Sequence, residues 1–173
     1  MTSDGKTLLT TKRFRVEEVS QTFPSGEVHQ RTVIRHPGAV SIIPMIDADR
    51  VCLIRNYRIA VRETLIEIPA GTLEANEPPE KTAERELIEE TGYRAERLTR
   101  LHSFYLSPGV IDEHMHLFLA EGLTDVGAAR EEGEEIENWI VDWEQAIKMV
   151  FNGQIKDAKT IIGILYYEQL RNK

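Results

Sequence analysis

The alternation of apolar and polar residues along the chain predicts mostly β-strands. The run AVSIIPMI over residues 39–46 is continuously apolar, as expected for a strand buried on both faces. Two further runs, around residues 12–23 and over 28–36, flank a Pro-Ser-Gly-Glu turn signal and are predicted to form an antiparallel hairpin. Residues 1–10 are interpreted as a mobile terminus. Other strands are expected over 51–58, 64–70, 98–106, 114–120 and 136–141.

Three stretches have helical features. The first spans about residues 78–91, where two leading prolines suit a first turn and Gly92 suits the position just past the helix end. The second begins at Asp142, which forms a capping-box-like pair with Gln145. The third begins at Asp157. Its inward face is expected to carry Ile161, Ile162, Leu165 and Tyr166.

Strands interspersed with a few helices indicate an α/β fold, in which helices flank a mixed sheet as an α/β/α sandwich. The N-terminal hairpin precedes this sandwich. Since a two-stranded hairpin is marginal by itself, it must pack on another surface, and a second subunit is one candidate. We expect one domain over 1–173, with an N-terminal arm over 1–37 and the core over 38–173.

Composition and charge narrow the class of protein. The 173 residues carry a formal net charge of −8 and a pI near 5.2, so a nucleic-acid-binding surface is not expected. The single cysteine, Cys52, lies in the apolar run VCLI and is interpreted as a core residue rather than a reactive thiol. No signal peptide is indicated, and no apolar run approaches the ~18–20 residues that span a bilayer. The expected location is the cytoplasm, without a membrane partner.

The first helix carries a concentration of negative charge. Glu86, Glu89 and Glu90 stand at i, i+3 and i+4, so their carboxylates share one face, while Ala83 and Leu87 can pack inward. Like charges at this spacing destabilise a helix unless a cation neutralises them. Clustered carboxylate oxygens suit Mg²⁺ or Mn²⁺, and Mg²⁺ readily takes phosphate oxygens as its other ligands. The alternative is a solvated acidic face.

A longer motif surrounds these glutamates. All fixed positions of the Nudix box are met without a gap, at Gly71, Glu77, Arg85, Glu86, Leu87, Glu89, Glu90, Gly92 and Tyr93. The chain therefore resembles Nudix hydrolases, which cleave a nucleoside diphosphate linked to another moiety. The resemblance implies that Glu86, Glu89 and Glu90 bind the metal with the backbone carbonyl of Ala70. It also implies that Arg85 and Glu77 pair to brace the loop; a carboxylate stabilised near a helix N-terminus is the other reading of Glu77.

Flanking stretches resemble one group within this family. His36–Val40, Arg55–Arg58, Leu65–Gly71 and Ser107–Gly109 are similar to ADP-ribose pyrophosphatases, although GDP-mannose hydrolases share several of these motifs. The implied reaction is hydrolysis of ADP-ribose to AMP and ribose 5-phosphate, with Mg²⁺ as the cofactor and Mn²⁺ as a possible substitute. The alternatives are the same chemistry on GDP-mannose or another nucleotide sugar, and a Nudix module that senses a ligand without turnover. The resemblance also implies a homodimer, with the N-terminal hairpin crossing to the partner.

Matching positions in the family suggest which residues bind the nucleotide-sugar substrate. Arginine clamps phosphates bidentately, so Arg35 and Arg58 are the candidates for the diphosphate, against the alternative of ordinary surface arginines. Glu113 would touch the ribose or phosphate region, unless it is a solvated loop carboxylate. The turn Ser107, Pro108 and Gly109 would face the ligand, with backbone N–H groups near Gly109 as donors.

The implied mechanism is attack of water on one phosphorus, which a general base would assist. In related pyrophosphatases a glutamate of a loop late in the chain takes that role. Here this late loop is residues 130–135, directly before Ile136. Alignment of this loop to the strand that follows it selects Glu132 and Glu134, one as base and the other reaching a metal. The remaining glutamates of the loop are read as solvated. The pair His114 and His116 could suggest zinc, but the companion ligands of a zinc site are not evident nearby.

Overall fold

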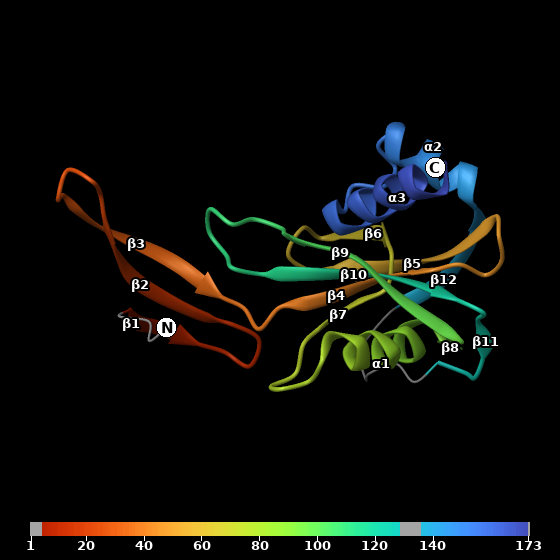
Figure 1. Cartoon of the computed structure of the whole chain (residues 1–173), viewed down its shortest axis with the longest axis horizontal. Helices are drawn as coiled ribbons and strands as arrows, with labels where there is room; N and C mark the ends of the chain where they lie inside the picture. Colours follow the sequence, from red (N-terminus) through yellow and green to blue (C-terminus); the bar gives the residue numbers. More distant parts are fainter. Residues whose placement is uncertain (1–4, 129–135, 173) are drawn as a thin grey trace.

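The computed structural model describes residues 5–128 and 136–172 (Figure 1). An N-terminal sheet projects from the remainder of the molecule and contains β1 (Lys6–Thr10), β2 (Arg15–Thr22) and β3 (Val28–Arg35) in that order, all antiparallel. The expected hairpin is therefore confirmed. The expectation of a mobile segment over residues 1–10 is wrong for residues 6–10, because backbone pairing with β2 orders them although Leu8 and Leu9 stay exposed.

The core contains two sheets. The mixed sheet has the order β7-β4-β10-β9, in which β4 and β10 are parallel. The second sheet is antiparallel, with the order β12-β5-β6. A short pair joins β8 (Tyr93–Arg94) to β11 (Thr124–Asp125). The longer core strands are β4 (Ala39–Pro44), β5 (Arg50–Arg58), β6 (Glu63–Glu67), β7 (Ala70–Thr72), β9 (Arg97–Tyr105), β10 (His114–Glu121) and β12 (Ile136–Asp142).

One expected strand, over residues 64–70, is divided between the two sheets. β6 ends at Glu67 and pairs with β5, whereas β7 begins at Ala70 and pairs with β4. Pro69 lies between them, and a proline has no N–H to donate to a sheet. The chain therefore changes sheets immediately before Gly71.

Helices cover both faces of this β layer, which confirms the α/β/α sandwich (Figure 1). α1 (Pro79–Thr91) lies on one side and packs Ala83 and Leu87 against a core cluster that includes Phe118. α2 (Trp143–Phe151) and α3 (Ala158–Arg171) cover the other side, over a cluster that includes Leu53 and Leu117. The inward packing of Ala83 and Leu87 and the buried Cys52 are as expected. No helix of the described residues is long and apolar enough to cross a membrane.

The two C-terminal helices differ from expectation in detail. Asp142 precedes α2 but makes no side-chain capping bond, so the expected capping box is absent there. In α3 the buried residues are Lys159, Thr160, Gly163 and Ile164, whereas the expected inward residues are only half-buried. The reason is Gly163, where an added Cβ would lie 3.0 Å from Ile68 Cδ1, so the helix approaches the sheet through its smallest residue.

Candidate active site

Arg85 is the hub of the polar cluster on α1. One of its terminal nitrogens, Nη1, lies 2.7 Å from Glu86 Oε1 and 2.9 Å from Glu89 Oε2. The other, Nη2, lies 3.2 Å from Glu77 Oε2, so the expected brace between Arg85 and Glu77 is confirmed. Burial opposes the charge of Arg85, yet the bonds to Glu77 and Glu86 raise its pKa above the ordinary value. The cation that offsets the crowded carboxylates in this structure is therefore a side chain of the same motif.

The turn between β6 and α1 brings backbone groups to the same cluster. Glu90 is buried, and its Oε2 accepts a hydrogen bond of 2.9 Å from the backbone N–H of Ala70. A Cβ added to Gly71 would lie only 1.9 Å from Glu86 Cδ. Glycine at this position thus leaves the space that the Glu86 carboxylate occupies. The turn therefore contacts Glu90 and leaves room for Glu86, and Arg85 links Glu86 to Glu89; that these residues bind a metal with Ala70 stays a prediction.

The donor set at this site fits a hard divalent cation. Three carboxylates and the backbone carbonyl of Ala70 supply only oxygen, the ligand type that Mg²⁺ and Mn²⁺ prefer. The space above Gly71 keeps the Glu86 carboxylate next to that backbone. In the described residues no three acidic, histidine or cysteine side chains converge at metal-ligand spacing, since Glu86 and Glu89 here face Arg85.

The brace between loop and helix leads to a pH-dependent prediction. Hydrogen bonds from Arg85 and from Thr82 lower the pKa of Glu77 below its ordinary value of 4.5. Because the folded-state pKa is the lower one, the stabilisation is complete above about 4.5 and disappears as the pH falls through the folded-state value. Glu77→Gln is expected to lower the free energy of unfolding at neutral pH by about 1–2 kcal/mol.

Urea unfolding of the wild type and of Glu77→Gln, followed from neutral to increasingly acidic buffers, measures this effect. The difference between the two proteins should shrink as Glu77 becomes protonated. A matched control is Glu74→Gln, an exposed glutamate of the same loop, which should change stability little at any pH. A difference that stays constant into acid would show that the Glu77 charge contributes nothing.

Arg58 lies at the end of β5, beside this cluster. Its Nε and Nη2 donate to the two carboxylate oxygens of Glu67 at 2.7 and 2.6 Å. The bond to Glu67 raises the pKa of Arg58 against the effect of burial, and the charge of Glu90 adds to that increase. Two of the five N–H groups of Arg58 are engaged by Glu67, and the remaining ones are available to a ligand.

Arg35 occupies a different setting from the one expected of a surface arginine. Its Nε donates to the buried Glu17 at 3.0 Å and its Nη1 to Asp112 at 3.1 Å. The bonds to Glu17 and then Asp112 raise the pKa of Arg35. Asp112 also accepts from the backbone N–H of His36 at 2.7 Å, and Ile34 N donates to the carbonyl of Val110 at 2.9 Å. Arg35 therefore ties the loop after β9 to the N-terminal sheet.

That loop carries the other predicted substrate residues. Ser107, Pro108 and Gly109 are all exposed, and the carbonyl of Ser107 accepts bonds of 3.0 Å from Val110 N and Ile111 N. Glu113 is half-buried at the start of β10. The backbone hydrogen bonds of this loop lie within the loop itself and toward Ile34 of β3, so the structure groups these residues with Arg35 rather than with the glutamates of α1.

The two predicted catalytic glutamates, Glu132 and Glu134, lie outside the described residues. The strand that follows them, β12, begins at Ile136 and is tied to α1 by Asn138, whose side chain donates to the carbonyl of Thr91 at 2.7 Å. Their roles stay predictions.

The histidine pair on β10 has cationic rather than metal-binding surroundings. His116 Nδ1 lies 2.6 Å from Arg100 Nη2 and 3.0 Å from Ser103 Oγ. Burial and then the charge of Arg100 lower the pKa of His116, which favours a neutral ring that accepts a bond from Arg100. His114 stacks on Tyr105 and meets the ring of His116 edge to face. The described contacts thus give no support to a zinc site.

Two residues of the site were missed by sequence reasoning. Glu67 is buried three residues before Ala70 and bonds Arg58 and Lys159, and Lys159 is buried with it. A carboxylate between the apolar residues Ile66 and Ile68 is a signal that could have marked Glu67 as a buried, paired charge. Lys159 gave no comparable signal, because an isolated lysine at the start of a helix is usually solvated.

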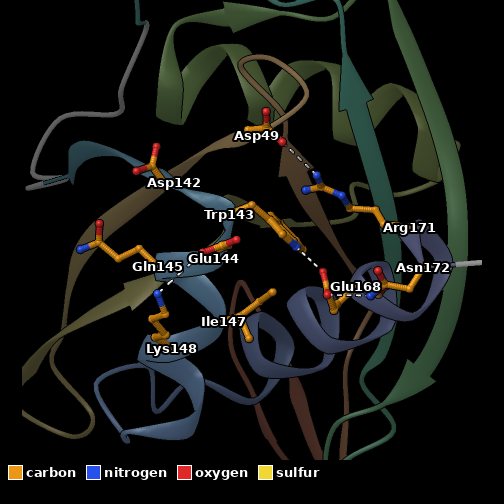
Figure 2. A pocket seen from close by; sticks show the side chains of 10 residues that line it. All are labelled: Asp49, Asp142, Trp143, Glu144, Gln145, Ile147, Lys148, Glu168, Arg171 and Asn172. Atoms are coloured by element: carbon orange, nitrogen blue, oxygen red, sulfur yellow. Dashed lines mark hydrogen bonds and ion pairs between the residues drawn. The ribbon is translucent and has the colours of Figure 1, made fainter.

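A pocket of about 720 Å³ lies elsewhere, on the face covered by α2 and α3 (Figure 2). Several of its polar side chains are paired with one another: Trp143 Nε1 donates to Glu168 at 2.6 Å, and Arg171 lies 3.3 Å from Asp49. Since α1 covers the opposite face, this pocket does not include the glutamate cluster.

Comparison with known proteins agrees with the geometry of the α1 site. The NUDIX domain family matches residues 35–162, and the chain belongs to the Nudix hydrolase family. Members of this family use divalent metals.

Individual relatives cover most of the chain. It is 43% identical over 155 residues to the ADP-ribose pyrophosphatase of Bacillus subtilis (strain 168), covering 88% of this chain and 83% of that protein. It is 36% identical over 158 residues to the methanol dehydrogenase activator of Bacillus methanolicus, covering 90% and 84%. It is 39% identical over 159 residues to the GDP-mannose pyrophosphatase of Cronobacter sakazakii, covering 84% and 82%.

A solved structure supports the fold. The crystal structure of an ADP compounds hydrolase matches with a TM-score of 0.86 at 21% identity, covering 98% of this chain and 92% of that one. The match extends over the N-terminal strands as well as the core, since nearly the whole chain is included.

Proposed function

We propose that this Nudix hydrolase cleaves the diphosphate of ADP-ribose with Mg²⁺ and releases AMP and ribose 5-phosphate. The observation that carries the proposal is the turn at Ala70 and Gly71, which holds Glu86 and Glu90 against the backbone three residues after Glu67, the partner of Arg58. This arrangement combines a hard-metal donor set with a phosphate-binding group. Similarity to an ADP-ribose pyrophosphatase along most of the chain supports this substrate.

We assign metal binding and phosphate binding to different residues of the chain. Glu86, Glu89, Glu90 and the carbonyl of Ala70 would hold Mg²⁺ or Mn²⁺. The bound ion supplies charge neutralisation on the diphosphate and increases the acidity of nearby water. Arg58 would hold a phosphate oxygen through the guanidinium edge that Glu67 leaves available.

Proton transfer is assigned to the late loop. Glu132 or Glu134 would accept the proton of the attacking water, and the other would reach the metal. A positioned general base of this kind contributes roughly 10²–10⁴-fold to the rate.

The loop after β9 would bind the sugar end of the substrate. Ser107, Pro108 and Gly109 are exposed, and Glu113 lies directly before β10. Arg35 is assigned here too, because it holds the loop through Asp112 and can donate to a phosphate with its remaining N–H groups. Its position between Glu17 and Asp112 supports a role in fixing the loop as well as in binding.

A substrate panel tests the proposal. The purified protein is incubated with Mg²⁺ and each of several nucleotide sugars, and a phosphomonoesterase converts the monophosphate products to measurable phosphate. ADP-ribose is expected to be the best substrate by kcat/KM. Chelation of the metal is expected to abolish turnover, and restoring Mg²⁺ should recover it. No turnover of any diphosphate with metal would favour a ligand-sensing module.

GDP-mannose is the second candidate substrate, because the GDP-mannose pyrophosphatase of Cronobacter sakazakii is 39% identical to this chain. The metal site would serve both substrates equally, since it acts on the shared diphosphate. Equal kcat/KM values for GDP-mannose and ADP-ribose would remove the preference for ADP-ribose. The activator from Bacillus methanolicus shows that a relative of similar identity has been named for an effect on another enzyme.

We also propose a homodimer built through the N-terminal sheet. This sheet projects from the core (Figure 1). It exposes the apolar side chains of Leu8, Leu9 and Val28 by 49%, 52% and 54%, which a second copy would cover. Light scattering at micromolar concentration is expected to give twice the monomer mass. Leu8→Lys combined with Leu9→Lys should then shift the mass toward the monomer, and a monomeric wild type would contradict the proposal.

A further inference from the structure

A fully buried carboxylate lies directly behind Arg58. The side chain of Glu67 is 1% exposed and binds both Nε and Nη2 of Arg58, a two-point contact that fixes the plane of the guanidinium group. Arg58 itself is 40% exposed on its side chain. In the described residues Nη1 of Arg58 has no protein partner, so the unused edge of the group faces outward from Glu67.

Glu67 has a second cationic partner. Lys159 Nζ contacts the Oε2 atom of Glu67 and lies 3.0 Å from Asp157 Oδ1, with its side chain only 8% exposed. Burial opposes ionisation of Glu67, but Arg58 and Lys159 outweigh it and the pKa is lowered overall. The unit thus holds two cations, Arg58 and Lys159, and two carboxylates, Glu67 and Asp157, so that both charges of the buried Glu67–Lys159 contact are paired.

The same unit is connected to the metal-binding turn. Asp157 Oδ2 accepts bonds of 2.9 and 2.6 Å from the backbone N–H and the hydroxyl of Thr160. Thr160 Oγ1 in turn accepts a bond of 2.9 Å from the backbone N–H of Ile68. The N-terminus of α3 therefore fixes the segment after Glu67, two residues before Ala70.

We infer that Glu67, held by Lys159, is a positioning residue that presents the free guanidinium edge of Arg58 to a phosphate of the substrate. The inference rests on the proposed function, because it assigns Arg58 to the diphosphate. A guanidinium already fixed in its binding orientation loses little further conformational freedom when the ligand arrives. An Arg58 without Glu67 would have to be ordered by the ligand itself, and binding would weaken.

The competing explanation is that Glu67 and Arg58 form an ion pair that only stabilises the fold. The two explanations differ in whether the effect of losing Glu67 depends on the presence of Arg58. If Glu67 acts through Arg58, removing Glu67 matters only while Arg58 is present. If Glu67 only stabilises the fold, its loss lowers the melting temperature whether or not Arg58 remains, and substrate binding is unaffected. A double-mutant cycle separates these cases.

The experiment uses Glu67→Gln, Arg58→Met and the double variant in the full chain with Mg²⁺. For ADP-ribose, Glu67→Gln is expected to raise KM roughly tenfold with kcat changed less than about threefold, the pattern of lost ground-state binding. Arg58→Met should raise KM by at least as much. The double variant should match Arg58→Met within about twofold, because the effect of Glu67 is already lost with Arg58.

A matched control is Glu63→Gln. Glu63 lies on the same strand and pairs with Lys156 at 2.7 Å, but it is exposed, so KM should stay within about twofold of the wild type. If Glu67→Gln fails to fold, Glu67→Asp keeps the charge that Lys159 needs and still withdraws the carboxylate from Arg58. It should raise KM at least about threefold.

Calorimetric binding of inorganic pyrophosphate separates failure of this inference from failure of the proposed function. The dissociation constant should rise roughly tenfold in Glu67→Gln and no further in the double variant than in Arg58→Met. This result would support the inference even if ADP-ribose proved not to be a substrate. Multiplicative losses in the double variant, or an unchanged dissociation constant with a lowered melting temperature, would overturn it.

Discussion

Replacing Glu90 by glutamine is expected to reduce kcat for ADP-ribose on the order of 10³-fold, the scale on which loss of one charge-stabilising group acts. Glu90 is buried, and its carboxylate contacts the backbone N–H of Ala70, next to the carbonyl assigned to the metal. Glutamine removes one negative charge from a set whose function is to bind a divalent cation. The affinity for Mg²⁺, measured by calorimetry, should fall at least about tenfold.

Stability distinguishes this result from simple unfolding. The side-chain oxygen of glutamine can still accept the bond from Ala70, and the change relieves repulsion with Glu86 and Glu89, so the melting temperature should not fall. The matched control is Glu84→Gln on the exposed side of the same helix, where Glu84 pairs with Lys81 at 2.7 Å. Its activity should stay within about twofold. Unchanged turnover and ion affinity in Glu90→Gln would refute the metal site.

Gly71→Ala is expected to lower kcat/KM roughly 10²-fold while the protein stays folded. The new Cβ would lie 1.9 Å from Glu86 Cδ and 2.0 Å from Glu86 Oε1. These atoms end a flexible side chain, so Glu86 can swing away at modest cost in stability. A metal ligand that is displaced by an ångström or more no longer binds in the productive geometry.

The measurement combines kcat/KM with a melting curve. Thr72→Ala, a truncation at the exposed neighbouring position, serves as the control and should keep activity within about twofold. Raising the Mg²⁺ concentration should partly restore Gly71→Ala, because the defect is in metal binding. Full activity in this variant would mean that Glu86 need not lie over the Gly71 backbone.

The positions of the strands and of α1 follow largely from local patterns. The apolar run that became β4 is buried along its whole length, and the glycine after α1 adopts the left-handed conformation expected of a helix end, with φ of 79°. These features depend on residues close together in sequence. The same holds for the pairing of Arg85 with Glu77, which the Nudix motif implied and the structure confirms.

The predicted secondary structure differs from the observed structure where contacts between residues far apart in the sequence determine the conformation. β1 lacks a buried face, so its sequence has no periodic pattern that predicts a strand. Hydrogen bonds to β2 hold it in an extended conformation. On α3 the predicted residues Ile161 and Tyr166 do pack against the core, but the most buried positions include Gly163, which lets the helix approach Ile68, a contact between segments far apart in the chain. The split between β6 and β7 depends on two different partner strands.

The amino-acid sequence by itself indicated the family and the helix that carries the three glutamates, and it predicts their role as metal ligands, because these features depend on side chains at fixed spacings within one motif. Only the tertiary structure decided the surroundings of the two arginines. Arg35 is held by Glu17 and Asp112, and Arg58 by Glu67 and Lys159. The physical reason is that a buried charge must find its partner wherever the fold brings one, and neither the distance nor the identity of that partner is encoded in local periodicity.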